Sequence, residues 1–129
     1  MTGRAAWSAE VRRHFRLARG AGEPGPGGQR FGHGAAGAVS WGTQVRIGVT
    51  LDQAGHIVDL SWRCYGCPAT QAACSWLAAT VPRMHREQAA AVTATAMAEA
   101  LALPAERLGP LIVVEDALRD ALQSAGMND

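Results

Sequence analysis

Apolar and polar residues alternate between positions 44 and 64, which is the pattern of a β-hairpin with one buried face. The outgoing strand, 44–51, places on this face Val45, Ile47, Val49 and Leu51. The segment 52–55 has the composition of a turn. The return strand, 56–64, places on the same face Val58, Leu60 and Trp62.

Apolar residues at helical spacing predict four helices around this hairpin, at 9–19, 68–81, 86–103 and 111–125. Ser8 can cap the first helix, and Thr93 or Thr95 can cap a break within the third. One hairpin with helices before and after it predicts an α+β fold. We therefore expect a small antiparallel sheet (hairpin 44–64) with helices packed on one face.

Glycine and proline interrupt every pattern between positions 20 and 42. This segment contains nine of the fifteen glycines, together with Pro24 and Pro26. Such a composition predicts a long, flexible glycine-rich loop at about 20–42. Loops of this length are commonly functional. His33 is the candidate metal ligand within it, although a loop histidine is more often only solvated.

Length and composition narrow the class of protein. A chain of 129 residues predicts a single domain, 1–129, with its own core. The formal charge of +1 favours neither nucleic acid nor an anionic membrane as a partner. Apolar runs are much shorter than the ~20 residues of a membrane span. Three cysteines and no secretory signal pattern predict a cytoplasmic protein in a reducing compartment.

All three cysteines lie where the hairpin gives way to the second predicted helix. Cys64 continues the apolar phase of the strand, and Cys74 lies on the apolar face of the helix, so both are expected to be small core residues. Cys67 follows Gly66, and the next residue, Pro68, is favoured in the first turn of a helix. Because a helix N-terminus favours a thiolate, Cys67 is the strongest candidate for sulfur or metal chemistry.

Cys64 and Cys67 form a C-x-x-C pair, which is a weak signal by itself. Structural zinc takes four ligands, and the sequence has neither a second pair nor two suitably spaced histidines. A dithiol oxidoreductase places the pair in a βαβ unit, whereas a hairpin precedes it here. Cys74 lies about 10 Å along the helix from Cys67, too far for both to bind one metal ion. The residues alone predict that Cys67 is reactive or binds a metal ion. They leave open whether Cys64 takes part in the same site.

Five short motifs, in matching order and spacing, resemble the NifU/IscU family of iron–sulfur cluster assembly scaffolds. They are Trp7-Ser8-x-Glu10-Val11-x-x-His14-Phe15, Gly55-His56-Ile57-Val58-Asp59, Tyr65-Gly66-Cys67, Leu101-Ala102-Leu103-Pro104 and Glu115-Asp116-Ala117-Leu118. The resemblance implies the family's fold and a scaffold role that is not enzymatic. Family members build a cluster on three cysteines, an aspartate and often a histidine, and they receive the sulfur from a cysteine desulfurase.

Of the family's cysteine ligands, only Cys67 carries over to this chain. The family motif G-x-x-x-C-G-D is most similar to 32–38, where Ala36 and Ala38 replace the cysteine and the aspartate. The family's K-L-H-C falls on 107–110, where Gly109 and Pro110 replace the histidine and the last cysteine. The resemblance therefore implies a degenerate member that lacks two of the three ligand cysteines.

Three functional hypotheses result. In the first, the protein is a divergent scaffold or accessory factor that binds iron, zinc or sulfur through Cys67, with Cys64 and His33 as further candidate metal ligands. A homodimer would then supply four thiolates for an iron–sulfur cluster. In the second, it is an interaction module that binds no cofactor and regulates a cysteine desulfurase or another assembly protein. Thiol–disulfide exchange by Cys64 and Cys67 is a third, less favoured hypothesis.

Overall fold

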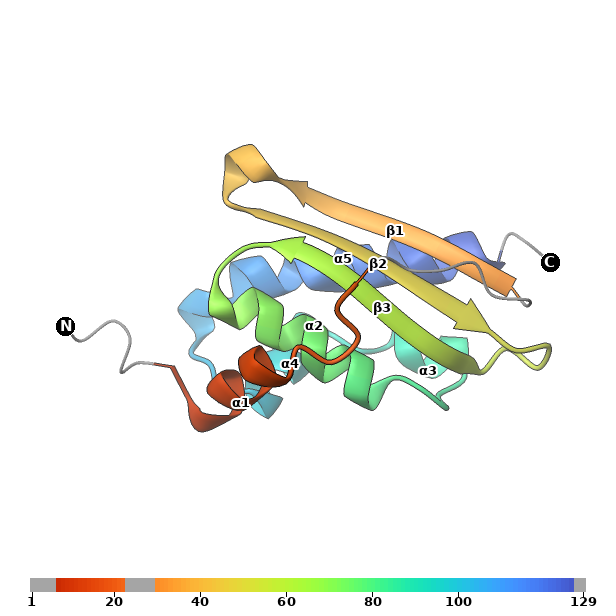
Figure 1. Cartoon of the computed structure of the whole chain (residues 1–129), viewed down its shortest axis with the longest axis horizontal. Coiled ribbons are helices and arrows are strands. Elements are labelled where there is room, and N and C mark those ends of the chain that lie inside the picture. Colours follow the sequence, from red (N-terminus) through yellow and green to blue (C-terminus); the bar gives the residue numbers. More distant parts are fainter. Residues whose placement is uncertain (1–6, 23–29, 127–129) are drawn as a thin grey trace.

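Three antiparallel strands form the centre of the fold, in the sheet order β1-β2-β3 (Figure 1). They are β1 (Arg30–Ala38), β2 (Thr43–Leu51) and β3 (Ile57–Tyr65). The helices are α1 (Ala9–Leu17), α2 (Pro68–Thr80), α3 (Arg86–Ala90), α4 (Ala94–Ala100) and α5 (Leu108–Gly126), with short 3₁₀ turns η2 (Val39–Trp41) and η3 (Ala105–Arg107). The computed structural model describes residues 7–22 and 30–126.

The helices pack on one face of the sheet, as predicted (Figure 1). Helix α5 lies against β1 and β2, α2 lies against β3, and α1 packs on α2. The other face carries exposed side chains such as His33, Arg46 and Arg63. This arrangement confirms the predicted α+β class.

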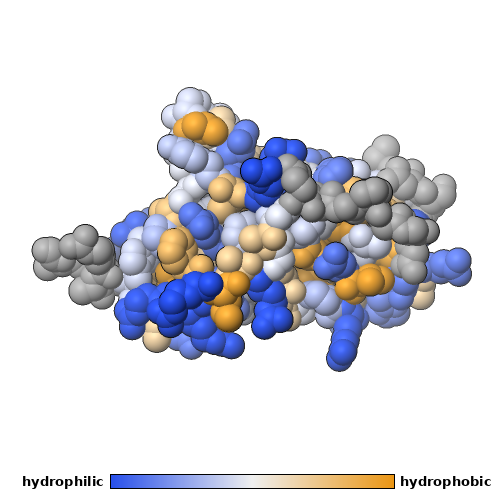
Figure 2. Space-filling view, in the orientation of Figure 1, coloured by the Kyte–Doolittle hydropathy of each residue, from blue (hydrophilic) through white to orange (hydrophobic). Residues whose placement is uncertain are grey.

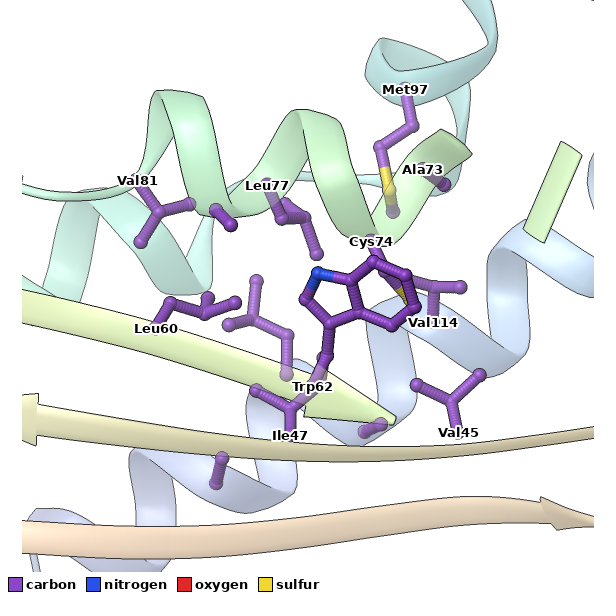
Figure 3. Close-up of a cluster of buried hydrophobic side chains, with 14 of the residues drawn as sticks. Val45, Ile47, Leu60, Trp62, Ala73, Cys74, Leu77, Val81, Met97 and Val114 are labelled. Carbon is purple, nitrogen blue, oxygen red and sulfur yellow. The ribbon is translucent and has the colours of Figure 1, made fainter. Parts of the chain in front are cut away.

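The apolar face of the hairpin forms the middle of the core (Figure 3). The inward side chains of β2 are fully buried, and Leu60 and Trp62 of β3 are nearly so. Val58 differs from the prediction, because a bulge after Thr50 pairs Leu51 with Ile57. Ile57 therefore takes the inward position, and Val58 is exposed.

The prediction of an irregular loop over 20–42 is wrong for its second half, because β1 pairs with β2 there. The glycines of β1 that point toward the helices allow close packing and do not form a turn. A Cβ atom on Gly34 would lie 2.2 Å from the backbone oxygen of Ala117, and one on Gly32 would lie 2.3 Å from that of Ala121. Glycine thus lets α5 lie directly against the backbone of β1. Residues 23–29 of the predicted loop lie outside the described residues.

Two predicted helices differ from the observed ones. The stretch 86–103 is divided into α3 and α4, and Thr93 caps α4 by accepting a hydrogen bond from the Ala96 N–H at 3.1 Å. Helix α5 begins at Leu108, so Gly109 and Pro110 lie in its first turn, where proline is tolerated. In the described part of the chain, no helix is long and apolar enough to cross a membrane.

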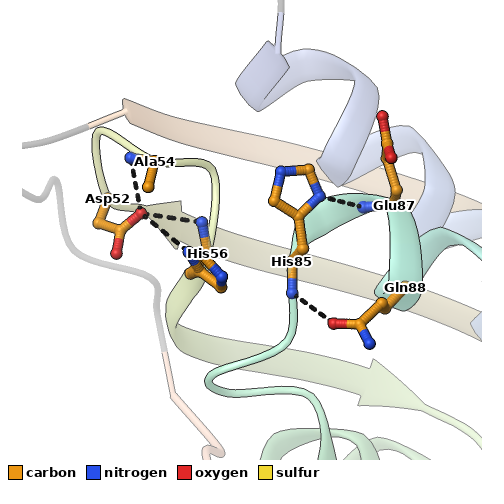
Figure 4. Close-up of polar contacts among 6 residues, drawn as sticks. All are labelled: Asp52, Ala54, His56, His85, Glu87 and Gln88. Atoms are coloured by element: carbon orange, nitrogen blue, oxygen red, sulfur yellow. Dashed lines mark hydrogen bonds and ion pairs between the residues drawn. The ribbon is translucent and has the colours of Figure 1, made fainter.

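The β2–β3 turn and the start of α3 meet at one end of the sheet (Figure 4). Asp52 Oδ1 closes the turn by accepting hydrogen bonds from the N–H groups of Ala54 at 3.0 Å and His56 at 2.8 Å. His85 Nδ1 caps α3 by accepting from the Glu87 N–H at 3.2 Å. The rings of His56 and His85 pack edge to face, with centroids 5.5 Å apart.

Candidate functional site

Cys67 lies on the turn between β3 and α2, as its flanking residues predict. It is the N-cap of α2, with an extended backbone (φ −72°, ψ 169°), and Pro68 follows in the first helical position. Its carbonyl oxygen accepts hydrogen bonds from the N–H groups of Thr70 at 3.0 Å and Gln71 at 3.2 Å. Its half-buried thiol lies 3.5 Å from Thr70 Oγ1. The thiol therefore faces the first turn of α2, whose free N–H groups favour an anion.

Tight packing fixes this turn. A Cβ atom on Gly66 would lie 3.1 Å from both Cβ and Oγ1 of Thr70, which is fully buried. Gln71 Nε2 donates a hydrogen bond to the Gly66 oxygen at 3.2 Å. The sequence Gly66-Cys67-Pro68 thus places the thiol by packing and by helix capping together.

The positions that the family resemblance matches to ligands lie at the same end of the sheet as Cys67 (Figure 1). Ala38 pairs with Thr43 at the end of the β1–β2 ladder, and β3 ends beside them at Tyr65. Thr43 also lines, with Gly109 and Pro110, a hollow of about 270 Å³ at the start of α5. Positions 36, 38, 109 and 110 therefore surround the end at which α2 begins.

The side chains at this end do not fit an iron–sulfur cluster. A two-iron cluster takes four protein ligands, generally cysteines. The residues at the matched positions, Ala36, Ala38, Gly109 and Pro110, have no side-chain donor for a metal ion. Across residues 7–22 and 30–126, no three His, Cys, Asp or Glu side chains are grouped so that they could hold a metal ion. Cys67 is thus the one side-chain donor among the positions that the family resemblance matches to ligands.

Cys64 and Cys74 hydrogen-bond to each other between β3 and α2. Cys74 has no exposed surface, as predicted, whereas Cys64 is only half-buried. The hydrogen bond and burial together raise the pKa of the Cys74 thiol well above its usual range, and the same hydrogen bond lowers the pKa of Cys64. The partner of Cys64 in the fold is therefore Cys74, which the C-x-x-C spacing does not indicate.

His33 lies on β1 and not in a loop. It pairs with Gly48, whereas Cys64 pairs with Val45, three positions earlier in β2. These three positions correspond to about 10 Å along the strand. His33 is exposed on the open face of the sheet, whereas Cys64 meets Cys74 on the helical side. The fold does not bring His33 together with Cys64 or Cys67.

The η2 turn carries exposed apolar side chains, which the sequence pattern did not single out. Val39 is 53% exposed and Trp41 is 75% exposed. Trp41 lines the same hollow as Pro110 and Val113. The turn projects from the body of the molecule (Figure 1), and Figure 2 shows hydrophobic surface on it. Exposed apolar side chains gathered in this way are typical of a protein contact surface.

His14 is a buried polar residue that the helical pattern also missed. It is 5% exposed, and its Nδ1 lies 3.1 Å from Ser75 Oγ. Ser75 Oγ also accepts a hydrogen bond from the Arg19 N–H at 3.0 Å. Burial, followed by the charges of Arg13 and Arg19, lowers the pKa of His14. These contacts join α1 to the middle of α2, and their role is structural.

Comparison with known proteins agrees with this geometry. The family model described as NifU-like N terminal domain matches residues 6–126. The iron-sulfur cluster assembly scaffold protein IscU of Haemophilus influenzae is 29% identical over 117 residues, which cover 91% of this chain and 93% of that protein. "Iron sulfur cluster assembly protein 1, mitochondrial" of Schizosaccharomyces pombe is 28% identical over 110 residues. These residues cover 85% of this chain but only 57% of the length of that protein. A nitrogen-fixing NifU-like protein (N-terminal) from Brucella abortus has a TM-score of 0.75 at 13% identity, with 94% of each chain covered.

Proposed function

Because the chain belongs to the family of NifU-like N-terminal domains, we propose that it acts in iron–sulfur cluster assembly as a divergent scaffold or accessory factor that uses Cys67. The observation that carries this proposal is the position of Cys67 on the N-cap of α2, at the end of the sheet where the matched ligand positions converge. The Haemophilus influenzae relative is named as an assembly scaffold, which supports a role without catalysis of its own.

Sulfur acceptance is the chemistry that one thiol supports without further ligands. A cysteine desulfurase presents sulfur as a cysteine persulfide. The Cys67 thiolate attacks the outer sulfur of this persulfide, the enzyme's S–S bond breaks, and the enzyme's cysteine leaves as a thiolate. Cys67 then carries the outer sulfur as its own persulfide, and no external oxidant or reductant is consumed.

Binding of iron or zinc through Cys67 requires donors from outside one chain. The matched positions supply none, and Cys64 is hydrogen-bonded to Cys74 on the inner side of the sheet. A homodimer that brings two copies of Cys67 together is the arrangement that would raise the number of thiolates. Metal analysis of freshly purified protein, with and without Cys67→Ser, tests this weaker alternative.

Mass spectrometry after incubation with a cysteine desulfurase and free cysteine tests sulfur acceptance. We expect the wild-type protein to gain the mass of one sulfur atom and Cys67→Ser to gain none. Cys64→Ser is the matched control, because it removes a nearby thiol and leaves the N-cap of α2 intact. If the desulfurase turns over and the wild-type protein gains no sulfur, sulfur acceptance is wrong.

The second candidate function is an interaction module that regulates a desulfurase or another assembly protein. It is favoured by the exposure of Val39 and Trp41 next to the first turn of α5. A pull-down with the desulfurase distinguishes the two functions. Binding that survives Cys67→Ser but is lost with Trp41→Ala, without sulfur transfer, supports the module.

A further inference from the structure

A hollow of about 550 Å³ lies between α3 and the last turns of α5. Helix α3 begins beside the β2–β3 turn, whereas Cys67 follows the opposite end of β3, so the hollow is separate from the candidate site. Pockets that bind small molecules have volumes of about 300–1,000 Å³. The hollow is therefore of a size that suits a small ligand, and its lining indicates which kind.

Both helices contribute apolar side chains to the lining. Leu122 of α5 is 5% exposed, and Ala90 is the last residue of α3. Arg119, which also lines the hollow, joins the two helices, because its Nε donates a hydrogen bond to the Ala90 oxygen at 3.3 Å. The Arg119 guanidinium forms a salt bridge with Glu115. The charge of Arg119 is thus matched within the protein, and this wall is held in place without a ligand.

Arg86 and Glu87 carry the two remaining charges of the lining. Both line the hollow from the first turn of α3. A Cβ atom on Gly126 would collide with Arg86 Nη1, so the guanidinium reaches from α3 to the end of α5. Among the residues that the structure describes, no carboxylate forms a salt bridge with Arg86 and no cation forms one with Glu87. The hollow therefore offers one guanidinium and one carboxylate to a ligand.

We propose that this hollow binds a free α-amino acid with an apolar side chain. Arg86 donates hydrogen bonds to the carboxylate of the ligand, whose two oxygens match the planar guanidinium. The Glu87 carboxylate accepts a hydrogen bond from the ammonium group of the ligand. The apolar side chain of the ligand covers Leu122 and Ala90, which removes apolar surface from water. A zwitterion matches both charges, whereas a simple anion would face Glu87 and a simple cation would face Arg86.

The test follows the backbone amide signals of the isotope-labelled full chain by NMR during titration with L-leucine. We expect saturable shifts in α3 and in the last turns of α5, with a dissociation constant of about 1 mM. Isocaproate is leucine without its ammonium group, and isoamylamine is leucine without its carboxylate. Each should bind about tenfold more weakly than leucine, because each lacks one charge-assisted hydrogen bond.

Two substitutions separate the roles of the two charges. Arg86→Gln should bind leucine about tenfold more weakly than the wild type and should no longer prefer leucine to isoamylamine. Glu87→Gln should likewise bind leucine about tenfold more weakly and should no longer prefer leucine to isocaproate. Arg16→Gln is the matched control, because it removes an exposed arginine from α1, and it should bind leucine as the wild type does.

Three results would overturn the site. The first is a wild-type protein that shows no saturable shift at about ten times the expected dissociation constant. The second is a set of shifts that lies outside α3 and α5. The third is an Arg86→Gln protein that binds leucine as tightly as the wild type. None of these measurements involves Cys67, iron or a desulfurase, so this site and the proposed function fail separately.

Discussion

Gly34→Ala should destabilise the protein more than any exposed substitution, because α5 lies directly on the backbone of β1. The added Cβ atom would lie 2.2 Å from the Ala117 oxygen and from the Ala121 nitrogen. Carbon and oxygen atoms approach comfortably to about 3.3 Å, so strand and helix must separate by roughly 1 Å. Both obstacles are backbone atoms, which cannot rotate away as a side chain can. We expect a cost of about 3 kcal/mol, the upper part of the range for overpacking.

Urea denaturation followed by circular dichroism measures this cost. With an m-value near 1.5 kcal/mol per molar, the unfolding midpoint should fall by about 2 M urea. Gly109→Ala is the matched control, since it lies in the first turn of α5 and its Cβ atom would meet nothing within 4 Å. Alanine there should raise the free energy of unfolding by about 0.5 kcal/mol, because it restricts the unfolded chain.

The two glycines are replaced by the same residue, so their difference isolates the contact between β1 and α5. If Gly34→Ala unfolds within about 0.5 kcal/mol of the wild type, strand and helix do not pack as closely as described here. The result also bears on the functional end of the sheet. A displaced β1 would move Ala36, Ala38 and the η2 turn relative to the start of α2.

Three further predictions concern other parts of the chain. The lowered pKa of His14 means that the unfolded chain binds more protons than the folded one, so stability present above about pH 6.5 is lost as the pH falls. The urea midpoint should therefore drop more between about pH 7.5 and 5.5 in the wild type than in His14→Gln, and equal drops would refute this. Thr93→Ala should lower the free energy of unfolding by about 1 kcal/mol, because it removes the α4 cap; an unchanged midpoint would contradict the cap. The combined variant Ala36→Cys, Ala38→Asp and Pro110→Cys should gain visible absorbance on anaerobic reconstitution with iron and sulfide, whereas a colourless product would show that missing donors are not the whole cause.

Much of the fold could be predicted because its hairpin and long helices repeat one pattern over many residues. The alternation of apolar and polar residues predicts that Val45 and Ile47 point inward, and the helical spacing predicts that Leu118 lies on the buried face of α5. All three side chains are buried in the structure. Strand β1 was missed because its inward positions are Gly32 and Gly34, which carry no hydrophobic signal. Their reason is the close approach of α5, a contact between segments far apart in sequence. Composition cannot distinguish a glycine that packs from a glycine that turns.

The candidate site was predictable in part for a related reason. Gly66 and Pro68 flank Cys67 with local signals, and the structure places the thiol on the helix start that they indicate. The sequence predicts a loop around His33, because the glycines beside it hide the pattern of the strand. The exposure of Trp41 at the η2 turn also depends on the missed pairing of β1 with β2, so no local pattern could have shown it.

The three thiols show why spacing along the chain is a poor guide to their pairing. Cys64 is the last inward residue of β3 and pairs with Val45, so the strand directs it toward α2. Cys74 lies on the face of α2 that meets the sheet, and these two periodicities bring the pair together across ten positions of sequence. Cys67 lies after the last residue of β3 and before the first residue of α2. Neither the strand nor the helix pattern therefore directs its side chain into the core. One thiol is therefore available for exchange with a partner protein, and the other two are available to each other. It follows that Cys67→Ser should abolish sulfur acceptance, whereas Cys64→Ser should leave it unchanged.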